Sequence, residues 1–212
     1  MKRALIGLAV TTFTVLALAG PASAASGQVT QVRFNGTFAE ALWSTSSAAS
    51  FTNYEVNVST SKQGSELYVD QFTGNLNAMG NFTGGTDTFA DVTTGFSFAI
   101  DKNQLTSAST NGSGLPAMTC SVDASGNESG CSATTMDATV TWTGQGPITR
   151  AVNNQHFKSS GFSQTNHVNG TDRAAAATGT VAGSTLGASE LAFADLGFTN
   201  SGTITRCIGP SC

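Results

Sequence analysis

The sequence contains little charge and very little histidine. Only 10% of its 212 residues are Asp, Glu, Lys or Arg, and there are two histidines, whereas about 25% charged residues is usual in soluble domains. A Ser–His–acid triad would have to use His156 or His167, and both lie in a polar stretch that is typical of a loop. No Gly-x-Ser-x-Gly, His-Glu-x-x-His, phosphate-loop or calcium-loop pattern occurs. The sequence therefore predicts no catalytic residue, no bound metal and no cofactor.

Long apolar runs are also absent, except at the amino terminus. A Met-Lys-Arg start is followed by an uncharged, largely apolar segment at 4–20, and Ala22 and Ala24 give the small-x-small pattern that a signal peptidase requires. The run is shorter than the roughly 20 apolar residues of a spanning helix, and threonines interrupt it. We expect residues 1–24 to be a cleaved signal peptide of bacterial type. Residues 25–212 would then be a secreted, extracellular domain without stable membrane insertion.

Basic residues are few and scattered. Removal of the leader takes away Lys2 and Arg3 but no acid, so the mature chain carries 7 basic and 13 acidic residues, and its net charge changes from −4 to −6. Contacts to phosphates require clustered Lys and Arg. The sequence therefore excludes nucleic acid as a partner and disfavours an anionic membrane surface.

The four cysteines are spaced as two local pairs. In an exported protein an even number of cysteines indicates disulfides, and four cysteines allow three pairings. We favour Cys120–Cys131 and Cys207–Cys212, because each pair brackets a turn-prone stretch that contains glycine. A metal site is the less favoured alternative, because the spacing is not Cys-x2-Cys and no histidine lies nearby in the sequence.

Alternation of apolar and polar residues dominates the mature sequence. It is clear at 32–42, 54–59, 96–101 and 139–152, and Gly, Asn, Ser and Asp turns separate such segments. No segment carries the apolar spacing of a helix over three turns. The sequence predicts an all-β fold, an antiparallel β-sandwich or barrel-like fold of about 8–10 strands, preceded by the signal peptide.

A weak internal similarity suggests a duplication. The segment 34–36 resembles 142–144, and 77–82 resembles 176–181 in the same order. The single domain at 25–212 would then consist of two similar halves, 29–105 and 137–206, joined by a loop that the first cysteine pair closes. The alternative is that all-β sequences resemble one another through their shared alternation.

Three charged residues share the alternation phase of apolar neighbours. Each has large apolar residues two positions away: Glu40 has Phe38 and Leu42, Arg150 has Ile148 and Val152, and Asp195 has Phe193. A charge that faces a core is costly unless it is paired and hydrogen-bonded. We therefore expect these three residues to form a buried salt bridge, to be turned outward by bulges, or to form the polar floor of a ligand cavity.

Trp43 and Trp142 are candidates for a stacking surface in such a ligand site, with core packing as the alternative. Together the observations favour a secreted binding or interaction protein without catalysis, whose partner would be a small molecule, a glycan or another protein. A second hypothesis is a secreted glycan-directed hydrolase in which Glu40 and Asp195 act as paired carboxylates about 5–10 Å apart in an open cleft. A third is a structural protein of the cell envelope. Whether the protein is an enzyme stays open, with the balance against it.

Overall fold

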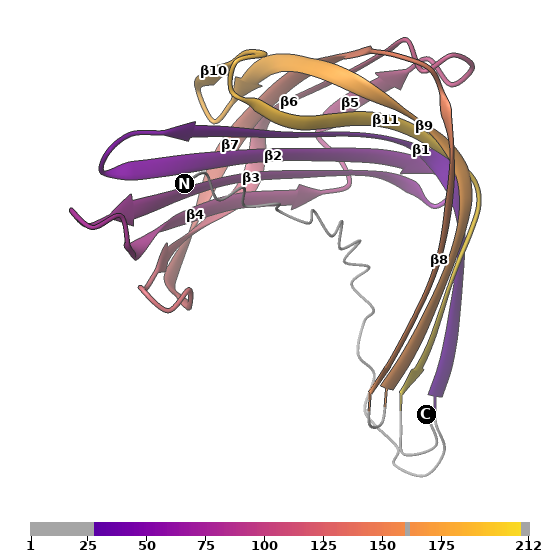
Figure 1. The fold of residues 1–212 in the computed structure, drawn as a ribbon, viewed down its shortest axis with the longest axis horizontal. Helices are drawn as coiled ribbons and strands as arrows, with labels where there is room; N and C mark the ends of the chain where they lie inside the picture. The colour runs from indigo at the N-terminus through magenta and orange to yellow at the C-terminus, as the bar shows by residue number, and fades with distance from the viewer. Residues whose placement is uncertain (1–27, 160–161, 209–212) are drawn as a thin grey trace, which may run out of the picture.

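The computed structural model describes residues 28–159 and 162–208 (Figure 1). The expected signal peptide and Cys212 lie outside these residues. Strands account for the regular structure of the described segments, and none of these segments contains a helix long and apolar enough to cross a membrane.

The prediction of an all-β, antiparallel fold is confirmed. Eleven strands follow one another within the described residues: β1 (Gln28–Ser46), β2 (Ser50–Ser61), β3 (Gly64–Leu76), β4 (Phe82–Val92), β5 (Phe96–Ile100), β6 (Ser107–Val122), β7 (Glu128–Gly144), β8 (Thr149–Ser159), β9 (Phe162–Val181), β10 (Ser184–Leu186) and β11 (Leu191–Ile208). The number exceeds the expected 8–10 because the segment at 107–122, taken as part of a connecting loop, is strand β6, and because three residues of a turn-rich segment form β10. The duplication of two halves stays a prediction.

Eight of the strands form a closed, barrel-like ring. Neighbours pair in the order β9, β11, β1, β2, β3, β4, β6 and β7, and β7 pairs with β9 again. β5 joins β6, and β8 and β10 join β9. In Figure 1, β1 to β4 run side by side across the view, and β6 and β7 cross behind them. Because the strand order closes on itself, the ring has no free sheet edge. A free edge is where strands of another molecule could otherwise pair with the sheet.

A four-stranded extension leaves the ring at one end. It consists of β8, the first half of β9, the last half of β11 and the start of β1. Figure 1 shows these strands bending sharply away from the ring. The register shifts between Phe34 and Gly36 in β1 and between Thr199 and Ser201 in β11, where the two strands pass from the ring into the extension. Such irregularities bend a strand and increase its twist, which accounts for the position of the bend.

Large side chains fill the interior of the ring. Trp43 and Trp142 are fully buried and pack with Leu67, Leu196 and a surrounding set of Val and Ala side chains. The indole N–H of Trp142 in β7 donates to the backbone oxygen of Glu40 in β1, 2.8 Å away. One tryptophan side chain therefore spans the ring from one wall to the other.

The expected inward phase of β1 was wrong. The buried residues of its second half are Thr37, Ala39, Ala41 and Trp43, at odd positions, while Glu40 and its even-numbered neighbours lie on the outer face, half-buried. The physical reason is the space that Trp142 needs, because small alanines on either side of Glu40 let the indole ring reach the β1 backbone. In β2, the apolar residues of the alternating segment 54–59, Tyr54, Val56 and Val58, are the buried ones.

Large residues of β1 instead have partners outside the ring. Phe38 lies opposite Gly197 of β11, and a Cβ atom at position 197 would collide with the Phe38 ring. A glycine opposite an aromatic residue lets the ring lie flat across the neighbouring strand. The outer face of β1 and β11 is therefore partly covered by its own side chains.

Candidate functional site

The structure brings together two of the three predicted charged residues. Glu40 in β1 lies directly opposite Asp195 in β11, and both side chains are half-buried on the outer face. Directly opposed residues of antiparallel strands have Cβ atoms about 4.5–5.5 Å apart. The two carboxyl groups are therefore close neighbours on the outside of the ring, and not in its interior.

Arg150 does not join them. It lies on β8, which pairs with β9, and its exposed guanidinium donates from Nε to Oδ1 of Asn169 at 3.4 Å. Trp43 and Trp142 are 0% exposed, so neither indole ring offers a stacking surface to a ligand. The three expected charges therefore form no common cluster around a central cavity.

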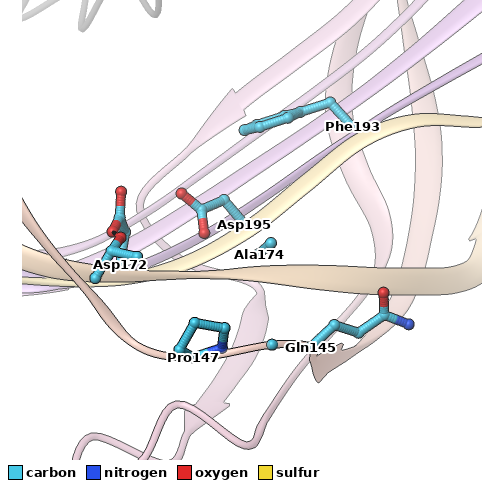
Figure 2. Close-up of a pocket in the computed structure, with 8 residues that line it drawn as sticks. Gln145, Pro147, Asp172, Ala174, Phe193 and Asp195 are labelled. Carbon is cyan, nitrogen blue, oxygen red and sulfur yellow. Dashed lines mark hydrogen bonds between the residues drawn. The ribbon is translucent and has the colours of Figure 1, made fainter.

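A pocket opens beside Asp195 on the outer surface. Its volume is about 290 Å³, and its lining comes from the loop between β7 and β8, from β9 and from β11: Gln145, Gly146, Pro147, Thr149, Asp172, Ala174, Phe193 and Asp195. Figure 2 shows the carboxylates of Asp172 and Asp195 with the Phe193 ring on one side and Pro147 of the loop on the other. Asp172 was not among the predicted site residues. The loop that carries Pro147 could be recognised in the sequence, because it interrupts two alternating segments.

The loop wall of the pocket is held in place by hydrogen bonds. Gly146 adopts a φ of 66°, a left-handed conformation that glycine reaches without steric cost, and Pro147 fixes the next turn. The backbone N–H of Gln145 donates to Ala174 O at 2.6 Å. Arg173 donates from Nε to Gly146 O at 3.0 Å and from Nη1 to Gln104 O at 2.9 Å. The wall is therefore fixed to β9 before any ligand arrives.

The two carboxylates of the pocket repel each other. Burial raises the pKa of Asp195 to about 6, the charge of Asp172 adds to the rise, and backbone N–H groups of Leu196 and Arg173 partly oppose it. Asp172 accepts a hydrogen bond from the hydroxyl of Thr149. The pKa of Glu40 rises to about 7, because of burial first and then the charges of Asp195 and Glu55. An ionised carboxylate is therefore disfavoured here by desolvation and by its neighbours alike.

The same pattern continues across the sheet as a band that we call the outer acidic row. It consists of one or more carboxylates from each of β9, β11, β1, β2, β3 and β4: Asp172, Asp195, Glu40, Glu55, Asp70 and Asp87. Glu55 lies directly opposite Asp70. The pKa of Asp70 rises to about 8, through burial and then through its hydrogen bond with Asp87 and that group's charge. The outer acidic row therefore crowds carboxyl groups on one face, where burial and neighbouring charges oppose their ionisation.

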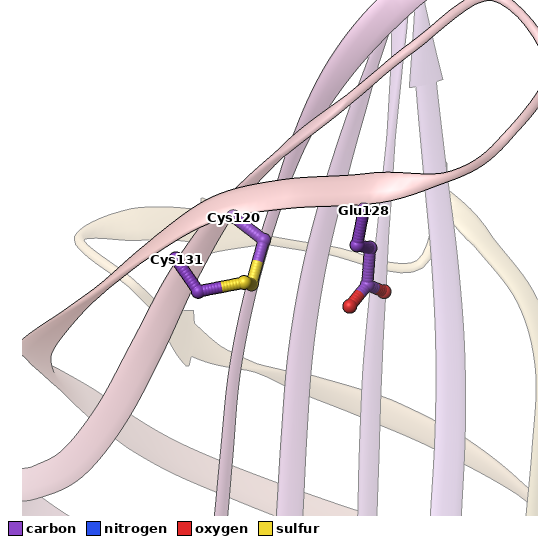
Figure 3. A group of neighbouring side chains, drawn as sticks. All are labelled: Cys120, Glu128 and Cys131. Carbon is purple, nitrogen blue, oxygen red and sulfur yellow. A yellow bond between two sulfur atoms is a disulfide. The ribbon is translucent and has the colours of Figure 1, made fainter.

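Among the described residues, one group of Cys and Glu side chains has ligand atoms close enough together for a metal ion, but a disulfide occupies its two sulfur atoms. Ligand atoms of Cys120, Glu128 and Cys131 lie within 4.8 Å of one another, but the two sulfur atoms are bonded together (Figure 3). This confirms the predicted Cys120–Cys131 disulfide and leaves no thiolate for a metal. Cys207 is also disulfide-bonded, whereas Cys212, its predicted partner, lies outside the described residues.

The two histidines lie on strands and not in a loop. His156 is on β8 and His167 on β9, and both are exposed. Each ring uses its Nδ1 atom in a local hydrogen bond, His156 with Thr165 Oγ1 and His167 with Asn154 Oδ1. Neither histidine lines the pocket.

Comparisons of the chain with protein-family models, with curated proteins and with solved structures find no match. The function must therefore be inferred from the pocket and its chemistry.

Proposed function

We propose that this protein is a secreted, non-catalytic binding protein that holds its ligand in the pocket between β9, β11 and the 145–149 loop. The observation that carries the proposal is the contrast between a filled interior and an open, pre-formed pocket outside it. Phe193 is 43% exposed at the rim of that pocket, beside two carboxylates. Binding sites typically combine such apolar walls with a few convergent polar groups.

The residues of the pocket support binding better than catalysis. Thr149, its only hydroxyl side chain, donates to Asp172, and none of the eight lining residues is a histidine, lysine or cysteine. A nucleophile with an adjacent general base of suitable pKa is the usual signature of covalent catalysis. Secretion is supported by the expected leader and by the Cys120–Cys131 disulfide, since disulfides persist in oxidising compartments.

A fragment screen by two-dimensional ¹H–¹⁵N NMR on residues 25–212 tests the proposal. We expect bound fragments to shift the backbone amides of Gln145, Ala174 and Asp195. Ala174→Leu, which places a larger side chain in the pocket, should abolish these shifts. Thr178→Leu is the matched control, because Thr178 is exposed on the same strand but does not line the pocket. Fragments that bind only elsewhere, or equally well to the Ala174→Leu variant, would contradict the proposal.

Hydrolysis of glycosidic bonds is a second candidate, and one observation favours it. Glu40, with a pKa of about 7, keeps a proton near neutral pH directly opposite Asp195, whose pKa of about 6 is lower. Two neighbouring carboxyls with separated pKa values can serve as acid and base. Chromogenic glycosides test this directly: turnover by the wild type that Glu40→Gln abolishes would support the hydrolase, and no turnover on any glycoside class would remove it.

A further inference from the structure

We infer that the ligand of this pocket is an organic ammonium ion, with its cationic head between Asp172 and Asp195 and an apolar part against Phe193 and Pro147. The inference rests on the proposed binding function and adds the chemical class of the ligand.

The two carboxylates reach the same space from neighbouring strands. Asp195 in β11 lies opposite Ala174 in β9, and Asp172 is two residues before Ala174 on the same face of that strand. The two are therefore diagonal neighbours, and both line the pocket. Ionised carboxylates only accept hydrogen bonds, whereas an ammonium group only donates them. A cation between the two groups would satisfy both and remove their mutual repulsion.

The described residues supply no cation to this space. None of the eight lining residues is Lys or Arg. Arg173, the adjacent residue in β9, uses Nε and Nη1 to hold the backbone oxygens of Gly146 and Gln104, so it fixes the wall of the pocket. Beyond the pocket, the outer acidic row consists of carboxyl groups, and those of them that are ionised attract cations to this face.

The apolar wall indicates that the cation carries a hydrocarbon or aromatic group. Phe193 lies two residues from Asp195 on the same face of β11, and its ring borders the pocket (Figure 2). The face of an aromatic ring attracts a nearby cation, and an apolar group on Pro147 and Phe193 would remove their surfaces from water. A bare metal ion would leave this wall uncovered.

The size of the pocket limits the ligand. Its volume of about 290 Å³ lies at the lower limit of the roughly 300–1,000 Å³ that sites for drug-sized ligands occupy. The space therefore suits a small amine with a single ring or a short alkyl chain better than an extended oligosaccharide.

Three probes with the same apolar part and different charge test the inference: 2-phenylethylamine, 2-phenylethanol and 3-phenylpropanoate. We expect NMR titration at pH 7.5 to show amine binding at the pocket at least about tenfold tighter than alcohol binding, as for a gained charge-assisted hydrogen bond, and no binding of the carboxylate. Equal binding of amine and alcohol at the pocket would overturn the ammonium assignment and leave the proposed binding function intact. Amine shifts spread over β2 to β4 instead of the pocket would overturn it as non-specific attraction.

Two variants separate the pocket from the general acidity of the face. Asp195→Asn should weaken amine binding by about tenfold or more and leave 2-phenylethanol unchanged. Asp91→Asn is the matched control, because it removes a carboxylate from β4 without touching the pocket. Equal weakening by both variants would overturn the inference.

The pH dependence provides an independent measurement. The ionisable groups that face Asp195 are Asp172 of β9 and Glu40 of β1, which lies directly opposite Asp195. Amine affinity should fall as the pH is lowered through the Asp195 pKa of about 6, because a neutral carboxyl no longer attracts the cation. An affinity that is constant from pH 8 to pH 5 would contradict binding by this carboxylate.

Discussion

The inside of the ring and its outer face obey different physical rules, although the same strands supply both. Inside, β1 presents Ala39, Ala41 and Trp43, which pack among other apolar side chains and are excluded from water. Outside, one residue away in sequence, Glu40 is held half-buried among other carboxylates that oppose its ionisation. The interior lowers the free energy of the fold, whereas the outer acidic row raises it. Charge conflicts of this kind are concentrated at functional sites, which is why we propose a binding site on the outer face.

The interior also contains buried polar atoms that destabilise the fold. Trp43 Nε1 and Thr37 Oγ1 are buried and have no hydrogen-bond partner in the part of the chain that the structure describes, while Trp142 Nε1 donates a hydrogen bond to the Glu40 backbone oxygen. A buried unsatisfied polar atom costs about 1–3 kcal/mol. The two tryptophans therefore offer a matched pair for measuring what holds the interior together.

The largest expected effect comes from emptying the interior. Trp142→Ala removes a fully buried indole ring and its hydrogen bond, and should lower the free energy of unfolding by about 3–5 kcal/mol in urea denaturation. Trp142→Phe should destabilise more than Trp43→Phe, because only Trp142 loses a hydrogen bond and Trp43→Phe removes an unsatisfied donor. The reverse order would show that ring shape, not hydrogen bonding, distinguishes the two sites.

A second effect concerns the covalent link between a buried and an exposed position. Cys120 of β6 is buried and Cys131 of β7 is exposed, and their disulfide closes a loop with a sequence separation of 11. Replacing both residues by alanine should cost about 2–3 kcal/mol, because the unfolded chain gains freedom. Thermal unfolding of the double variant beside the oxidised wild type measures the loss. A change under about 0.5 kcal/mol would mean that the β6–β7 pairing already constrains this hairpin in the unfolded chain.

The sequence predicted the part of the fold that local chemistry determines. Tyr54, Val56 and Val58 alternate with polar residues, so their inward phase and the all-β fold follow from composition and period. Cys120 and Cys131 bracket a turn and were paired correctly. Each of these features depends on residues that are close together in the chain.

The features that sequence reasoning missed depend on distant partners. Ala39 and Ala41 face inward because Trp142, about a hundred residues later, occupies the space beside them. Asp172 joins Asp195 only through the register of β9 on β11, which the sequence of neither strand specifies. The candidate site was therefore found in part, through Asp195, while its second carboxylate required the structure.

On the outer face, the raised pKa values of three carboxyl groups determine how stability changes with pH. The pKa values of Glu40, Asp70 and Asp195 rise to about 7, 8 and 6, so the folded protein binds protons that the unfolded chain releases above about pH 4.5. The contribution of these three groups to stability should therefore be fully present below that pH and be lost as the pH rises towards 8. Glu40→Gln should flatten the urea-midpoint profile and add about 2 kcal/mol at pH 8.

Asp101 provides the opposite control. Hydrogen bonds from the Thr106 hydroxyl and from the backbone of Asn103 and Gln104 hold the pKa of its exposed carboxylate below the usual value. Its contribution is present at neutral pH and is lost as the pH falls, so Asp101→Asn should not flatten the profile. Equal flattening by Asp101→Asn and Glu40→Gln would mean that net charge, not burial, sets the pH dependence.

The smallest effect on stability is expected at the pocket itself. Phe193 is 43% exposed and lies at the pocket rim, so Phe193→Ala should change the free energy of unfolding by less than about 0.5 kcal/mol. The same change should nevertheless weaken binding of 2-phenylethylamine severalfold, because the apolar part of the ligand loses its wall. Urea denaturation and NMR titration of one protein sample measure both quantities.

Met79→Ala is the matched control, since Met79 is a more exposed apolar residue away from the pocket, and its replacement should change neither stability nor binding. A large loss of stability with unchanged binding would place Phe193 with the structural residues and remove the distinction between the inside of the ring and its outer face at this position.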